Sequence, residues 1–280
     1  MSEWRDEADV VIVGGGVMGA STAFHLAEAG DTDVVLVEAE QLAGGSTAKS
    51  AGGVRLQFSD EINIELAKRS IAAFEDFPRR PGADIELKQV GYLFLLTEAA
   101  DVADFEANVA LQNALGVPSR MLTPAEAQAL SPLIEIDDVL AASFCPKDGH
   151  VNPEMVVFGY AAAARRLGAL VVQQCPVTGI DVTDGEVRVV HTARGPIRTN
   201  TVVCAAGAWS DRIARMAGRA LPVVPVSRPI WYTEPMPGRP AQIPMTIDFS
   251  TGFYFHSEGE GLLFGMADPE QPAGFDAPTR

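Results

Sequence analysis

The 280-residue sequence predicts an α/β fold joined to a second, α+β part that is built on an antiparallel sheet. Two apolar runs, at 10–13 and 34–37, have the composition of strands that are buried on both faces of a parallel sheet. A glycine-rich turn and a helical pattern lie between them, in the order strand, helix, strand of a Rossmann-like unit. Near the other end, three short strand patterns at 246–249, 253–256 and 262–266 alternate with Gly and Ser turns, as in an antiparallel meander.

The turn after the first strand carries three glycines with the spacing Gly14-x-Gly16-x-x-Gly19. In this pattern the first glycine permits a tight turn, the second lets a pyrophosphate approach the backbone, and the third lets the helix pack on the strand. The helix N-terminus offers unpaired N–H groups and a partial positive charge to a phosphate. The alternative is a glycine-rich turn of some other α/β protein, but the flanking strands and helix favour a dinucleotide site.

The second strand ends at Glu38, which lies 38 − 19 = 19 residues after the last glycine. The fingerprint places an acid about 20 residues on, where its carboxylate accepts the ribose hydroxyls. The strand–turn–helix unit therefore predicts the cofactor-binding residues Gly14, Gly15, Gly16, Val17, Met18, Gly19, Glu38 and Ala39.

A small, polar segment at 44–55 follows, rich in N–H and hydroxyl donors. If it is extended, its 12 residues reach roughly 40 Å, enough to follow a long cofactor from its pyrophosphate towards its reactive ring. The alternative is a flexible loop. The further cofactor-binding residues predicted here are Ser46, Thr47, Lys49, Ser50 and Gly52.

Composition excludes several classes of protein. The formal charge of −16 opposes binding to nucleic acid or to anionic membranes. No apolar run is long enough to span a bilayer, and residues 1–7 are too polar for a signal sequence. Cys145, Cys175 and Cys204 are interpreted as buried free thiols in a reducing compartment, which favours the cytoplasm. The four histidines show no metal-ligand spacing.

The remaining elements follow from periodicity and turn signals. A capping box at 123–126, with proline at the first helical position, starts one of the helices. Asp184-Gly185 between alternating runs indicates a hairpin. The expected helices are 60–77, one around 102–109, one from 123 and 152–167, with a short one near 210; the expected strands include 90–96, 139–144, 177–181, 187–190 and 201–206.

Taken together, these motifs resemble the D-amino-acid oxidase superfamily of FAD-dependent oxidoreductases, and more narrowly the sarcosine, dimethylglycine and glycine oxidases and dehydrogenases. The marks are VVIVGGGVMG, VVLVE, GGSTAKSAGGVR, GYLFL, DGHVNP, VVCAAGAWS and GFYFH. The resemblance implies a discontinuous FAD-binding domain of the glutathione-reductase type, 1–82 plus 150–218. It also implies a substrate domain, 83–149 plus 219–280, and the oxidation of an amine next to a carboxylate.

The resemblance also assigns positions along the cofactor. The three fingerprint glycines face the pyrophosphate, Glu38 takes the ribose, and Ser46 and Thr47 lie along the phosphates and the ring. Val177 meets the adenine through its backbone, and Ala206, Gly207 and Trp209 end a strand beside the flavin. The branch that attaches flavin covalently uses a histidine where this chain has Lys49. In monomeric sarcosine oxidases the linking cysteine lies in a C-terminal segment that is absent here, so non-covalent FAD is expected.

The implied reaction is oxidation of the C–N bond of a small amino acid or N-methyl amino acid by hydride transfer to FAD. Arg55 lies where sarcosine oxidases place an arginine that clamps the substrate carboxylate, as guanidinium can do with two hydrogen bonds. A structural ion pair is an equal alternative. Tyr254 and His256 alternate along a strand expected to line the pocket, with a core or surface role as the alternative for each.

Two other functions stay open: an NAD-dependent dehydrogenase, and a flavoprotein of this fold that acts as an assembly or scaffold factor. The specific amine and the electron acceptor are not specified by the motifs. Relatives continue beyond the meander, so the chain is expected to be an incomplete oxidase. Its last strand would then be an unpaired sheet edge, and its FAD affinity would be low. A partner chain or a homo-oligomer would complete the fold.

Overall fold

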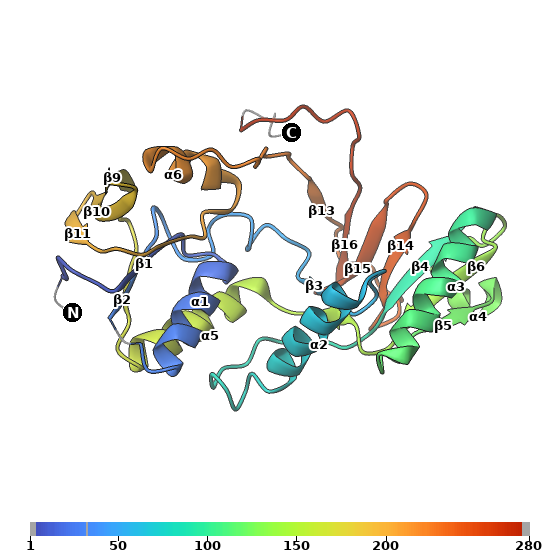
Figure 1. Cartoon of the computed structure of the whole chain (residues 1–280). Coiled ribbons are helices and arrows are strands. Elements are labelled where there is room, and N and C mark those ends of the chain that lie inside the picture. The colour runs from blue at the N-terminus through green and yellow to red at the C-terminus, as the bar shows by residue number, and fades with distance from the viewer. Residues whose placement is uncertain (1–3, 32, 276–280) are drawn as a thin grey trace.

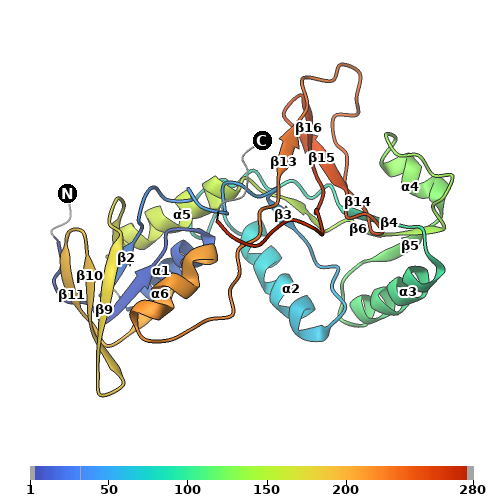
Figure 2. The ribbon, with the colours of Figure 1, turned by 90° about the horizontal axis from the view of Figure 1, so that it is seen from above.

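The computed structural model describes residues 4–31 and 33–275. Two sheets lie side by side, each with its own helices (Figure 1). Seen from above, α2 (Glu61–Glu75) lies between the two halves, close to the short strand β3 (Gly53–Val54) (Figure 2). The two halves are therefore joined around the segment that follows the predicted cofactor loop.

The first sheet has four parallel strands in the order β12-β1-β2-β8. They are β1 (Val10–Val13), β2 (Val34–Val37), β8 (Leu170–Val172) and β12 (Val202–Cys204). Helices α1 (Val17–Glu28) and α5 (Pro153–Arg166) pack on one face, against Ile12 and Leu36. The antiparallel strands β9 (Val177–Thr183), β10 (Glu186–Thr192) and β11 (Gly195–Arg198) cover the other face, against Val11 and Val35. Burial on both faces explains the continuous apolar runs.

The second sheet has seven strands in the order β13-β16-β15-β14-β4-β6-β5. They are β4 (Tyr92–Leu96), β5 (Arg120–Leu122), β6 (Ala141–Cys145), β13 (Ile230–Tyr232), β14 (Met245–Asp248), β15 (Tyr254–Glu258) and β16 (Gly261–Gly265). Helix α3 (Ala99–Ala114) contributes Phe105 to the face of Phe94, and α4 (Pro124–Leu130) contributes Ala127 to the face of Leu93. Because β14 and β4 run parallel, the sheet is mixed rather than antiparallel throughout.

Several local predictions are confirmed. Thr123 and Glu126 form the predicted capping box at the start of α4. The hairpin around Asp184-Gly185 joins β9 to β10, and β14, β15 and β16 form the meander. The helix expected at 60–77 is α2, and Asp60 caps it by accepting a hydrogen bond from the Asn63 N–H at 2.9 Å.

The prediction that the last strand is an unpaired edge was wrong. Strand β13, which the sequence pattern did not reveal among frequent prolines, pairs with β16 along its whole length. Trp231 of β13 stacks on Phe264 of β16, with ring centroids 5.8 Å apart. The exposed edge of this sheet on that side is therefore β13.

Two short strands connect the halves. Strand β3 pairs with β7 (Gly149–His150), and β7 follows the turn at Asp148. The first sheet contains strands from 10–37 and 170–204, and the second contains strands from 92–145 and 230–265. We therefore keep the two-domain division predicted from the sequence as a proposal.

Two general expectations have structural outcomes. Within residues 4–31 and 33–275, no helix is long and apolar enough to cross a membrane. The three cysteines are unpaired, but only Cys145 and Cys175 are buried. Cys204 is exposed because it ends β12, an edge strand, so the prediction of three buried thiols was wrong for this residue.

Candidate functional site

The glycine turn has the conformation that its three glycines allow. Gly14 has a positive φ of 114°, and its N–H donates to the Val37 carbonyl at 2.9 Å. A methyl group on Gly19 would overlap the Gly14 carbonyl oxygen, so the third glycine is required for the close approach of α1 to the turn. Gly16 has ordinary extended backbone, and a methyl group there would meet only Thr47 Oγ1 at 3.2 Å. A side chain at position 16 would therefore meet much less steric conflict than one at position 19.

The N-terminus of α1 lies against the polar loop predicted to follow the cofactor. The Val17 N–H donates to Thr47 Oγ1 at 3.1 Å, and Gly16, the N-cap, makes no side-chain capping bond. The loop itself folds into turns, with the Ala48 N–H bonded to the Ala43 carbonyl at 3.1 Å. The expectation of an extended 12-residue segment at 44–55 was therefore wrong for 44–50, because these local bonds shorten it.

Glu38 lies at the end of β2, as predicted, with both carboxylate oxygens accepting backbone hydrogen bonds. One accepts from the Gly15 N–H at 2.6 Å and the other from the Glu40 N–H at 2.8 Å. Glu38 thus holds the glycine turn in place. Each oxygen keeps a further lone pair for a ribose hydroxyl.

The other predicted cofactor residues surround this turn on several elements. Met18 is 69% exposed, and Ala39, Ser46, Lys49 and Ser50 are exposed. Gly52 has a φ of 65° and its carbonyl accepts from the Val151 N–H at 2.9 Å.

Val177 begins β9. Ala206 and Gly207 follow β12, and the Trp209 ring lies 3.8 Å from where a side chain on Gly45 would begin. The structure thus brings the segment after β12 to the 44–50 loop.

These features fit a dinucleotide diphosphate. The Gly15 and Val17 N–H groups already donate to Glu38 and Thr47, whereas Gly16 lies between them at the helix N-terminus without a side chain, which leaves the approach to its N–H open. A helix N-terminus with bare glycine backbone is a favourable anion site. The Gly16 N–H and the Thr47 hydroxyl would hold the diphosphate, and Glu38 the ribose.

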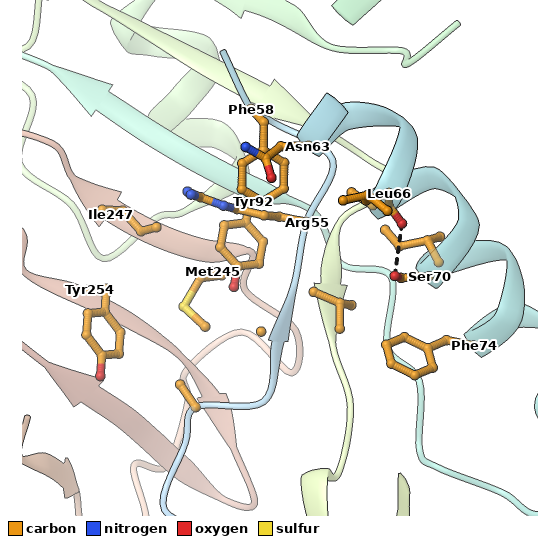
Figure 3. A pocket seen from close by; sticks show the side chains of 15 residues that line it. Arg55, Phe58, Asn63, Leu66, Ser70, Phe74, Tyr92, Met245, Ile247 and Tyr254 are labelled. Atoms are coloured by element: carbon orange, nitrogen blue, oxygen red, sulfur yellow. Dashed lines mark hydrogen bonds between the residues drawn. The ribbon is translucent and has the colours of Figure 1, made fainter. Parts of the chain in front are cut away.

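A cavity of about 560 Å³ lies on the other side of β3, lined by β3, α2 and the seven-stranded sheet (Figure 3). The Arg55 side chain points into it, with its guanidinium carbon 4.6 Å from the centre of the Phe58 ring and 5.6 Å from that of Phe94. Met245, Ile247 and Tyr254 line the wall that faces Arg55. Among the described residues no carboxylate forms an ion pair with Arg55, so the alternative of a structural ion pair is not borne out there.

The backbone next to Arg55 is held by a buried polar network. The Asp148 carboxylate accepts from the Leu56 N–H at 2.7 Å and from Gln57 Nε2 at 3.0 Å. Gln57 also donates to the Tyr92 carbonyl at 3.1 Å and accepts from the Ser143 hydroxyl at 2.6 Å. Burial raises the pKa of Asp148 to about 6, although these hydrogen bonds and the nearby Arg55 charge oppose the shift.

His256 does not line this cavity, so the expectation that it would do so was wrong. It is 1% exposed, and its ring centre lies 4.4 Å from that of His150. Burial is the main cause that lowers the pKa of both rings, that of His150 to about 4. Tyr254 of the same strand is half-buried and does line the cavity.

Sequence reasoning missed several residues around Arg55. Tyr92 lines the cavity, and burial raises the pKa of its hydroxyl. Gln57 and Asp148 are the buried network that fixes the Arg55 backbone. Asp148 lies in the DGHVNP motif and Tyr92 in the GYLFL motif, both of which were marks of the resemblance without a role for either side chain.

The fold and the glycine turn together define the class of proteins that have a dinucleotide-type turn on a parallel sheet and a cavity beside a second, mixed sheet. The family model described as FAD dependent oxidoreductase matches residues 9–280, so the chain belongs to this family. Its fold is that of the D-amino-acid oxidase superfamily, as the sequence motifs indicated.

Similar proteins agree with this assignment. The chain is 33% identical over 273 residues to mitochondrial dimethylglycine dehydrogenase of Mus musculus, covering 96% of this chain and 31% of that protein. It is 33% identical over 228 residues to sarcosine oxidase subunit beta of Arthrobacter sp, covering 79% of this chain and 56% of that one. The structure superimposes on L-proline dehydrogenase from P. horikoshii with a TM-score of 0.91 and 33% identity, covering 99% of this chain and 74% of that one. The chain thus spans about a third of the length of the dimethylglycine dehydrogenase.

Proposed function

We propose that this chain oxidises the C–N bond of a small amino acid or N-methyl amino acid, with FAD held non-covalently. The observation that carries the proposal is Arg55, a half-buried guanidinium in a largely apolar cavity without a carboxylate partner among the described residues. A buried charge is stable when it is paired and hydrogen-bonded. A substrate carboxylate would supply that pairing, with two parallel hydrogen bonds.

Different residues of the cavity would contact different parts of such a substrate. Arg55 would orient the carboxylate, while Met245 and Ile247 exclude water from its aliphatic part. Burial raises the pKa of the Tyr92 and Tyr254 hydroxyls. Both hydroxyls therefore stay protonated, and each can donate a hydrogen bond. Bound FAD would supply the chemistry as acceptor of a hydride from the carbon next to the substrate nitrogen.

The names of the relatives support the substrate class. They act on dimethylglycine, sarcosine and L-proline, which are small amino acids with a substituted nitrogen. The name of sarcosine oxidase subunit beta also supports a partner chain, and a homo-oligomer is the alternative that we keep. For the location we keep the cytoplasm as a proposal based on three unpaired cysteines, although the dimethylglycine dehydrogenase relative is mitochondrial.

The test is a screen for anaerobic flavin reduction. The purified chain is reconstituted with FAD, its visible spectrum is recorded, and N-methyl amino acids, proline, glycine and D-amino acids are added in turn. The proposal expects bleaching with at least one amine that carries a carboxylate and none with the matching amine that lacks one. Bound FAD without bleaching by any substrate would favour the scaffold alternative. Binding of NAD without FAD would favour the dehydrogenase alternative.

A further inference from the structure

Three potential metal ligands meet where β7 (Gly149–His150) lies beside β15 of the seven-stranded sheet. His150 lies on β7, and His256 and Glu258 lie two residues apart on β15, on the same face of the strand. One ligand atom from each lies within 4.8 Å of the others. The two histidines are 106 residues apart in the sequence (256 − 150), so only the fold brings them together.

The second observation is an unpartnered nitrogen. His256 Nδ1 lies 2.9 Å from the Ser257 carbonyl oxygen, which can only accept, so Nδ1 carries the proton and Nε2 carries the lone pair. Nε2 is buried and makes no hydrogen bond of normal geometry, although the Ala51 backbone lies close enough to the ring to raise its pKa. A buried acceptor without a partner is unfavourable, so this nitrogen indicates a missing ligand.

The hydrogen bond at His256 Nδ1 also matches the usual arrangement of a metal-binding histidine. Histidines that bind metal ions usually donate their other ring N–H to a carbonyl or carboxylate, which fixes the tautomer and the ring orientation. His256 already has this arrangement through Ser257. His150, 5% exposed, packs its ring at 34° to the His256 ring and is held through its backbone by Lys88, with N···O distances of 2.9 and 3.0 Å.

We propose that His150, His256 and Glu258 bind a divalent transition-metal ion of the zinc class. Two imidazole nitrogens and one carboxylate are a ligand set that Zn²⁺ takes, with water in a fourth position, whereas Mg²⁺ and Ca²⁺ prefer oxygen ligands. Two bonds of about 2.1 Å span at most about 4.2 Å, so one ligand must move inward. Glu258 is exposed, and its side chain can rotate towards the buried pair. The ion would tie β7 to β15 and so brace β3, the strand that leads to Arg55.

The experiment is calorimetric titration of ZnCl₂ into the chelator-treated chain, with Co²⁺ absorption as a second probe of four-coordinate geometry. The proposal expects one Zn²⁺ per chain and a rise in Tm on binding. His150→Ala and His256→Ala should each weaken binding by more than the roughly 10–100-fold that loss of an outer-shell partner causes. Glu258→Gln, a change on an exposed side chain that leaves the fold intact, should weaken it by about tenfold or more.

The controls are His25→Ala and His191→Ala, which alter the other two histidines of the chain, the first exposed and the second half-buried. They should leave the affinity unchanged. The proposal would be overturned if Glu258→Gln and at least one of His150→Ala and His256→Ala bound Zn²⁺ with the affinity of the parent chain. The absence of stoichiometric binding to the parent chain would also overturn it, in which case water fills the place beside Nε2. Because Zn²⁺ binding is measured without FAD or substrate, the result does not depend on the proposed function.

Discussion

The carboxylate of Asp148 accepts a hydrogen bond from the backbone N–H of Leu56 at 2.7 Å, across 92 residues of sequence. Leu56 directly follows Arg55, so a buried acid holds the backbone of the arginine that points into the cavity. Gln57 extends the same contact by donating to the second Asp148 oxygen at 3.0 Å. The guanidinium is therefore placed from a rigid segment, while its own nitrogens stay available within the cavity.

Asp148 gives the first prediction, which concerns pH. Burial raises its pKa to about 6 in the folded chain, against an ordinary value of 3.8. Its contribution to the free energy of unfolding is therefore fully present below about pH 4 and is lost as the pH rises through 6. Asp148→Asn should remove this dependence. Between about pH 4 and 6, the free energy of unfolding of the variant minus that of the parent should increase by about 1.4 kcal/mol per pH unit.

Urea unfolding at several pH values between about 4 and 7 measures this difference. The variant also loses one of two acceptors, a constant cost of about 1–3 kcal/mol that does not change with pH. Asp184→Asn, an exposed aspartate in the β9–β10 turn, is the matched control and should parallel the parent. If Asp148→Asn also parallels the parent, the carboxyl does not titrate in this range.

The second prediction separates the roles of two glycines. Gly16→Ala should fold normally, because its methyl group meets only Thr47 Oγ1 at 3.2 Å and its φ of −77° suits any residue. The same methyl group would stand where a diphosphate approaches the backbone. Loss of one charge-assisted hydrogen bond costs about 1.5–3 kcal/mol, or roughly tenfold to over a hundredfold in the Kd for FAD.

Fluorescence titration with FAD and a thermal melt test this pair of expectations. Gly179→Ala is the control for the added methyl group, which would lie 3.6 Å from the His191 ring, in ordinary contact, on β9 and outside the glycine turn. Gly19→Ala should lower the Tm, because the methyl group overlaps the Gly14 carbonyl. Unchanged FAD affinity in a folded Gly16→Ala variant would place the diphosphate elsewhere.

The third prediction concerns Arg55. Arg55→Lys should weaken a carboxylate substrate by roughly tenfold to over a hundredfold, because one ammonium cannot make the two-pronged contact. FAD content should not change, since Arg55 lies in the cavity and not at the glycine turn. Substrate concentration dependence of anaerobic flavin reduction is the measurement.

Arg120→Lys is a suitable control for this experiment. Arg120 also lies over an aromatic ring, that of Phe144 at 5.5 Å, but is exposed and does not line the cavity. It should leave substrate binding unchanged. Equal effects of the two substitutions would mean that stacking, and not carboxylate binding, is what Arg55 contributes.

The fourth prediction is that FAD is released by acid. Lys49, at the position where a histidine links flavin in one branch of the family, is exposed and cannot form that linkage. Precipitation of the FAD-loaded chain with trichloroacetic acid should therefore leave the yellow colour in the supernatant. Colour that remains in the washed pellet would show a covalent bond through another residue.

The sequence by itself determined the strand–turn–helix–strand unit near the start of this protein. Strand β1, the glycine turn, α1, β2 and Glu38 all lie within 10–38, so each contact among them depends on local spacing and on φ values that glycine permits. Local signals were weaker where the chain is rich in proline, as at β13, and where hydrogen bonds folded the 41–50 loop into turns.

Only the tertiary structure decided the cavity and the histidine pair. Arg55, Tyr92 and Tyr254 come from three distant segments, and the parallel pairing of β14 with β4 is what places the second sheet beside Arg55. The same packing separates Tyr254 from His256, two residues apart on one strand, by burying the second against His150. Alternation along a strand gives the face of a side chain, but the neighbours on that face depend on which strands the fold brings together.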